Sequence, residues 1–96
     1  MYNLEQAKKL TIEFINEDYE ALDDELILIE KNTIFKCYGW IFFYDSKKFL
    51  DTRIEGFRII GNSPVLFEKE SGHIEELGTA LPVGDYIDQY EQRMKK

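Results

Sequence analysis

The most apolar segment of the chain, residues 32–45, is apolar on both faces of any strand that it forms. Side chains along a strand alternate between two faces with a period of two residues. One face carries Phe35, Cys37, Gly39, Ile41 and Phe43. The other face carries Ile34, Tyr38, Trp40, Phe42 and Tyr44. Because an apolar sheet face needs a cover, the second face is predicted to meet either another layer of this chain or a protein partner.

Within this predicted strand we assign one face to the core and leave two residues open. The side chains expected in the core are those of Phe35, Cys37, Ile41 and Phe43. Tyr38 and Trp40 belong to the scaffold if the second helix buries them, and are hot-spot candidates if they are exposed. Gly39 indicates either a bulge or space for a large neighbour.

Apolar residues at spacings of three and four predict a helix near each end of the chain. The first helix covers residues 3–17, with Asn3 as its N-cap, and stops where a run of acidic residues would oppose the helix macrodipole. The second helix covers residues 82–95. Pro82 suits its first turn, and Arg93 favours its negative C-terminal end.

Short apolar segments between the two helices predict strands. Residues 25–31 form one strand, and a polar break at residues 31–33 is short enough to fold it against the aromatic segment as an antiparallel hairpin. Residues 65–69 and 73–77 form a second hairpin, in which Gly72 supplies a left-handed loop position.

The order of these elements predicts the fold class. Residues 45–53 are polar apart from Phe49 and Leu50 and are predicted to be a connection. The whole order indicates an α+β fold, with an antiparallel β-sheet of four to five strands and an N-terminal and a C-terminal α-helix packed on it. A length of 96 residues predicts a single domain, residues 1–96.

Charge and length narrow the possible functions. Twelve basic against nineteen acidic residues give a formal charge of -7. This charge repels phosphate backbones and anionic lipids, so we expect neither nucleic acid nor a membrane as partner. It fits either plain solubility or a basic protein partner. A chain of this length leaves little area for a deep substrate cavity, which disfavours an enzyme.

Cysteine use and the start of the chain indicate the compartment. The chain has one cysteine, which allows no internal disulfide, and begins without the basic, apolar and small-residue regions of a signal peptide. We therefore expect a cytoplasmic location. No apolar run approaches the ~20 residues that span a bilayer.

Few residues offer catalytic or metal chemistry. Cys37 and His73 are the only thiol and the only imidazole in the sequence, and a nucleophilic pair would need both. Cys37 is expected in the core, whereas a reactive thiolate needs a partly exposed, electropositive site. The acidic run lacks the alternating oxygens and central glycine of a calcium loop, and zinc requires more Cys or His. We therefore expect no enzyme activity, no cofactor and no metal site.

Two groups of side chains are candidates for binding a protein partner. The acidic run at residues 17–25, named here the acidic loop, supplies negative charge, although such a run is more often solvated than bound to a partner. Aromatic side chains are frequent anchors of interfaces, and core packing is an equally favoured role for them. The candidate partner-binding residues are Asp18, Glu20, Asp23, Asp24, Tyr38, Trp40, Tyr44 and Phe49.

Three motifs occur in an order that resembles a known family. They are GWIFFYD at residues 39–45, GNSPVLFEKESGHIEELGTA at residues 61–80 and YIDQYE at residues 86–91. Their order and spacing resemble the YrhB-like domain, also named the immunity protein 35 family. The resemblance implies a small bacterial cytoplasmic protein, in many members one that neutralises a toxin of interbacterial competition, commonly a papain-like peptidase. It implies no catalytic residues.

These observations lead to a main hypothesis and an alternative. The main hypothesis is an immunity protein, a monomer or weak homodimer without a cofactor, that binds a cognate protein toxin and blocks its active site or a necessary motion. Its acidic residues would steer it towards a basic toxin, and its aromatic anchors would come from the exposed strand face or from the loop at residues 45–60. The alternative is a chaperone-like protein that binds exposed apolar segments of clients, because some relatives of the family are of that kind.

Overall fold

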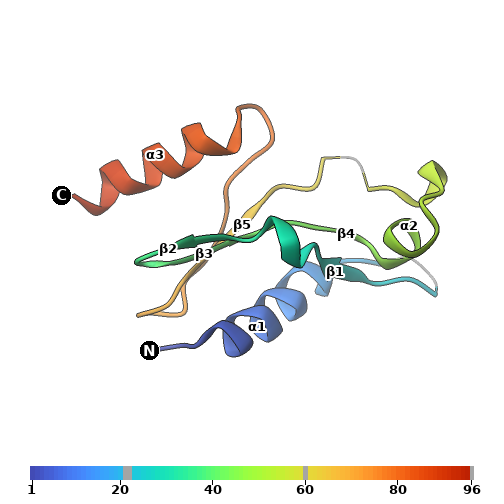
Figure 1. The fold of residues 1–96 in the computed structure, drawn as a ribbon, viewed down its shortest axis with the longest axis horizontal. Helices are drawn as coiled ribbons and strands as arrows, with labels where there is room; N and C mark the ends of the chain where they lie inside the picture. The colour runs from blue at the N-terminus through green and yellow to red at the C-terminus, as the bar shows by residue number, and fades with distance from the viewer. Residues whose placement is uncertain (21–22, 60, 96) are drawn as a thin grey trace.

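Two helices lie on opposite faces of a central antiparallel sheet (Figure 1). The computed structural model describes residues 1–20, 23–59 and 61–95. Its helices and strands are α1 (Leu4–Asn16), β1 (Leu26–Leu28), β2 (Ile34–Lys36), β3 (Gly39–Phe42), β4 (Tyr44–Ser46), α2 (Lys47–Thr52), β5 (Val65–Glu68), β6 (Ile74–Glu76) and α3 (Val83–Met94). The predicted α+β class with antiparallel strands and a helix near each end is confirmed.

Both predicted terminal helices form, within two residues of the expected bounds. The Asn3 side chain accepts a hydrogen bond from the Gln6 backbone N–H, and the Gln6 side chain accepts one from the Asn3 backbone, so α1 begins with a capping box. Pro82 precedes α3, and Arg93 lies in its last turn. None of the helices in the described residues is long and apolar enough to cross a membrane.

The strands form two sheets rather than one. The larger sheet has the order β2-β3-β5-β6, and β1 pairs with β4 in a separate two-stranded sheet. All the pairs are antiparallel. The predicted second hairpin is confirmed as β5–β6, with Gly72 at a φ of 77° in its loop.

The aromatic segment is not the single strand that its composition predicted. Lys36 pairs with Gly39 across a two-residue turn at residues 37–38, so the segment folds on itself as the β2–β3 hairpin. The chain leaves the strand conformation again at Phe43 before it enters β4. β1 pairs with β4 and not across residues 31–33, which take part in a short 3₁₀ helix, η1 (Glu30–Asn32), and its C-cap.

The turn at residues 37–38 places two residues of the predicted core, Phe35 and Cys37, at the surface. Phe35 is 65% exposed, because it lies on the edge strand β2 opposite Trp40, and Cys37 is exposed in the turn itself. Assigning these two side chains to the core was wrong. Ile41 is fully buried, as predicted, and Phe43 is half-buried beside it.

The chain itself covers both faces of β3. On the α1 side, Trp40 and Phe42 pack with Phe67 and the α1 residue Ala7. On the α3 side, a second cluster joins Tyr38, Ile41 and Leu66 to Ile87 and Tyr90 of α3. Figure 1 shows the two helices above and below the strands. The apolar faces are therefore core.

Residues 45–53 hold structure that their composition did not predict. Asp45 and Ser46 complete β4, and α2 follows directly. Ser46 caps α2 by accepting a hydrogen bond from the Phe49 backbone N–H, and Phe49 is buried. Arg53 ends the helix with a φ of 61°. A helix this short spans fewer than two turns, so no apolar period identifies it.

Candidate functional site: an acidic loop, a basic ridge and a groove

All four aromatic residues predicted to bind a partner lie in the interior. Tyr38 and Phe49 are each 8% exposed, and Trp40 and Tyr44 are each 9% exposed. The Tyr38 hydroxyl donates a hydrogen bond to Glu91 of α3, which ties the aromatic hairpin to that helix. Because α1 and α3 occupy the two sheet faces, the undecided pair Tyr38 and Trp40 belongs to the scaffold and not to an exposed contact surface.

One of the acidic residues predicted to bind a partner, Asp24, makes hydrogen bonds within the fold. Its carboxylate accepts hydrogen bonds from the Ser46 hydroxyl at 2.6 Å, the Tyr19 hydroxyl at 3.0 Å and the Lys48 backbone N–H at 3.2 Å. Burial opposes ionisation of this carboxyl, but the hydrogen bonds from Ser46, Lys48, Glu25 and Tyr19 outweigh it and lower the pKa of Asp24 below its ordinary value. Asp24 therefore connects the loop after α1 to the start of α2.

Replacing Asp24 with alanine should lower the free energy of unfolding by about 1–2 kcal/mol, because several donors lose their acceptor. The folded-state pKa lies below the ordinary 3.8, so the stabilisation is present above that pH and is lost as the pH falls through the folded pKa. Urea unfolding at neutral pH and near pH 3 measures the difference, which should shrink in acid. Asp18→Ala, at an exposed position, is the control and should change stability by less than about 0.5 kcal/mol. Equal losses in both variants would contradict this role.

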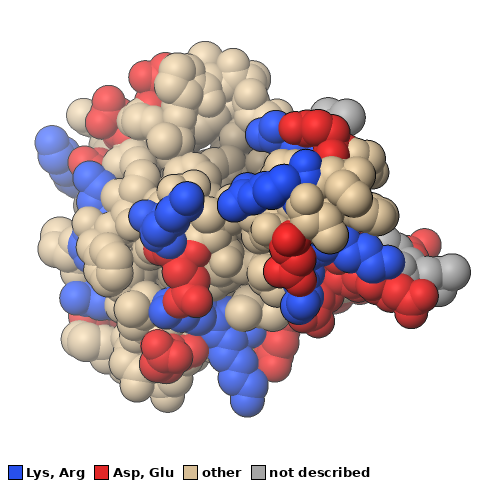
Figure 2. Space-filling view, turned by 45° about the vertical axis from the view of Figure 1, so that its right-hand side comes forward, with Lys and Arg blue, Asp and Glu red and all other residues tan. Residues whose placement is uncertain are grey.

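The other predicted acidic residues are accessible. Asp18, Glu20 and Asp23 are exposed, and Asp23 adopts a φ of 57°. Asp23 and Asp24 also border a hollow of about 480 Å³ that Lys47 and Lys48 line from α2. Acidic and basic side chains are thus brought together here, and Figure 2 shows red and blue residues interleaved on this face.

A second surface lies beside this hollow, within residues 45–60, a segment from which aromatic anchors for a partner were expected. We name residues 47–58 the α2–η2 ridge; it consists of α2, the bend at Arg53 and a 3₁₀ helix, η2 (Glu55–Phe57). Two large apolar side chains protrude from it, Ile54 with 55% exposure and Phe57 with 40%. Of the two phenylalanines in the ridge, Phe49 is buried and Phe57 is the exposed one, a difference that the sequence alone does not show.

Basic side chains stack on the aromatic rings of the ridge. Arg53 and Arg58 lie 5.7 Å and 5.4 Å from the ring centroid of Phe49, and the Lys48 ammonium lies 5.6 Å from that of Phe57. Contacts at this distance are cation–π interactions. They hold the cations along the ridge, where Arg58 also forms ion pairs with Asp45 and Glu55 at 3.9 Å.

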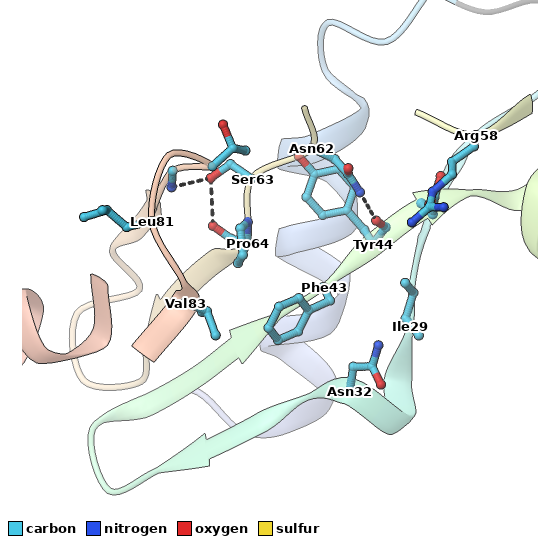
Figure 3. Close-up of a pocket in the computed structure, with 13 residues that line it drawn as sticks. Ile29, Asn32, Phe43, Tyr44, Arg58, Asn62, Ser63, Pro64, Leu81 and Val83 are labelled. Carbon is cyan, nitrogen blue, oxygen red and sulfur yellow. Dashed lines mark hydrogen bonds and ion pairs between the residues drawn. The ribbon is translucent and has the colours of Figure 1, made fainter. Parts of the chain in front are cut away.

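A groove of about 450 Å³ opens beside Phe43, where the strand conformation is interrupted between β3 and β4 (Figure 3). The loop of the GNSP motif forms one wall: Asn62 donates a hydrogen bond to the Tyr44 carbonyl, and Ser63 accepts one from the Gly78 N–H at 2.7 Å. Phe43 and Val83 supply apolar wall. Asn62 and Gly78, which belong to the second motif at residues 61–80, thus have structural contacts.

The two residues considered for a nucleophilic pair have separate surroundings. Cys37 is exposed in the β2–β3 turn, and His73 lies 3.1 Å from the Glu75 carboxylate in the β5–β6 hairpin. Among the described residues, no hydrogen bond joins Cys37 to His73. The geometry therefore does not present the pair as a dyad.

Comparisons with known proteins identify the family. Over 53 residues, which are 55% of this chain and 56% of the relative, the sequence is 43% identical to a protein of Escherichia coli (strain K12) named "Uncharacterized protein YrhB". The match thus spans about half the length of that curated relative. No solved structure matches the chain. The sequence model of the family described as "Immunity protein 35" matches residues 5–92. The chain therefore belongs to the immunity protein 35 family.

Proposed function

We propose that this chain is the immunity protein of a cognate protein toxin, which it neutralises by binding it in the cytoplasm. The match of residues 5–92 to the immunity protein family carries the proposal. Neutralisation by binding requires a stable scaffold and an exposed contact surface, and no chemistry. The described residues supply a scaffold whose sheet is covered on both faces and a surface that exposes large apolar side chains, among them Ile54 and Phe57.

Co-expression with the toxin tests this function. The proposal predicts that the reading frame beside this chain encodes a toxin domain, that this domain arrests growth when expressed alone, and that co-expression of this chain restores growth. A chain variant that fails to fold is the negative control. Continued arrest in the presence of the folded chain would overturn the proposal.

We extend the proposal to a papain-like peptidase as the toxin class. In that case the purified chain should inhibit hydrolysis of a peptide substrate completely at one chain per toxin molecule. Inhibition that requires a large excess would contradict tight binding of this kind.

A chaperone-like role predicts a different result. Exposed apolar side chains such as Phe35 would then protect unrelated proteins from aggregation during heating. We expect light scattering of such clients to be unchanged by this chain. Protection of several unrelated clients at modest ratios would favour the chaperone-like function instead.

A further inference from the structure

We propose that the α2–η2 ridge is the toxin-binding surface and that it fits an apolar pocket of the toxin bordered by carboxylates. The inference rests on the proposed function and names its contact surface and the chemistry of its partner. Interface cores are enriched in aromatic residues and arginine and depleted in aspartate, glutamate and lysine. Phe57 and Arg53 of the ridge are residues of the enriched kinds, whereas six of the nine residues at 17–25, the acidic loop, are aspartate or glutamate.

The apolar part of the ridge is concentrated at its tip. Ile54 and Phe57 lie three residues apart and are 55% and 40% exposed. The backbone N–H of Phe57 donates to the Ile54 carbonyl at 3.0 Å, so one turn of chain carries both side chains. Their removal from water on binding is favourable in proportion to the apolar area buried. An apolar pocket is therefore the complement of this tip.

The charge of the ridge is opposite to the charge of the whole chain. The chain has a formal charge of -7, yet residues 47–58 contain four basic and two acidic side chains. Lys47 is paired with Asp51 at 2.7 Å. Within the part of the chain that the structure describes, Lys48 and Arg53 form no ion pair and contact aromatic rings instead. Their charge is available to carboxylates of a partner, which arginine binds with two parallel hydrogen bonds.

The ridge is held in one shape before any partner arrives. Arg53 has a φ of 61°, a left-handed conformation that turns the chain sharply after α2. Thr52 supports the bend: its hydroxyl donates to the Lys48 carbonyl at 2.6 Å and accepts from the Ile54 N–H at 3.2 Å. Phe49 anchors the ridge in the core below. A surface held in place in this way loses little conformational entropy on binding.

Binding kinetics with the purified toxin domain encoded beside this chain test the inference. Phe57→Ala should weaken the affinity at least about tenfold, because it removes an aromatic anchor. The double variant Lys48→Glu, Arg53→Glu should slow association about tenfold at low salt, and added salt should reduce that difference. Circular dichroism and thermal unfolding confirm that each variant is folded.

Two matched controls separate the ridge from other surfaces. Phe35→Ala removes a phenyl ring that is 65% exposed on β2, and Asp18→Lys with Glu20→Lys reverses charge in the acidic loop. Both should keep affinity within about twofold of wild type. Folded ridge variants with wild-type affinity would overturn the inference and leave the proposed function intact. A wild-type chain that does not bind the toxin domain would overturn both.

Discussion

Gly39→Ala is expected to prevent stable folding of this chain. The new Cβ would lie 1.9 Å from the Phe67 carbonyl oxygen and 3.1 Å from the Glu68 Cα, and the backbone at Gly39 has a φ of 156°. The contacts at this position are backbone atoms of the paired strand β5, so no side-chain rotation relieves the clash. Separating β3 from β5 would open both clusters of the core, and we expect a loss of at least about 4 kcal/mol. Circular dichroism and urea unfolding measure it.

Gly84→Ala is the control for this prediction. Gly84 lies in α3, and a Cβ there meets no atom within 4 Å. Alanine is the better helix former by roughly 0.8 kcal/mol, so this variant should be as stable as wild type or more stable. A Gly39→Ala variant that unfolds at the wild-type urea concentration would show that the close approach of β3 and β5 is wrong.

Phe67→Ala is expected to lower the free energy of unfolding by about 3–5 kcal/mol. The Phe67 side chain is fully buried on β5, and Phe67 is the register partner of Trp40 on the neighbouring strand β3. Its ring meets the Tyr2 ring edge-on at a centroid distance of 5.4 Å. Its removal leaves a cavity between the sheet and the N-terminal segment and also loses the aromatic contacts. Small domains are stable by only about 5–15 kcal/mol, so this loss is a large part of the total.

Phe35→Ala is the matched control, because it removes the same ring from an exposed position. Phe35 lies opposite Trp40 on the edge strand and is 65% exposed. Its replacement should change stability by less than about 0.5 kcal/mol. Urea unfolding of both variants measures how much free energy of unfolding is lost when the same ring is removed from the core and from the edge strand. Similar losses in both would mean that Phe35 packs in the core, as the alternation of the sequence had suggested, and that the β2–β3 turn is wrong.

Elements with local signals were predictable. The apolar period and the Asn3 cap indicated α1, the period after Pro82 indicated α3, and Gly72 marked the β5–β6 loop. The turn at residues 37–38 was missed because a Cys-Tyr pair lacks the glycine or asparagine of common tight turns; the glycine follows it as Gly39. That single turn reversed the expected burial of Phe35.

The candidate site was predicted less well than the fold. The acidic loop was identified as charged, but the hydrogen bonds that make Asp24 structural come from Ser46 and Lys48, more than twenty residues away in the chain. Residues 45–60 were expected to supply aromatic anchors for a partner, but the helix in them was missed because α2 is too short to show a period. The exposed residues Ile54 and Phe57 of the α2–η2 ridge are of the same apolar types as core residues, so the sequence does not reveal that they are exposed.

The sequence by itself determined the α+β class, both long helices, the β5–β6 hairpin and the resemblance to immunity proteins. Local hydrogen bonding, capping and residue order are enough for each of these. Only the tertiary structure decided that the two apolar faces of β3 are covered by α1 and α3, and that exposed apolar side chains lie on the α2–η2 ridge. The physical reason is that exposure depends on which distant segments pack over a side chain. A phenylalanine in the core and one on the ridge are identical until the chain has folded.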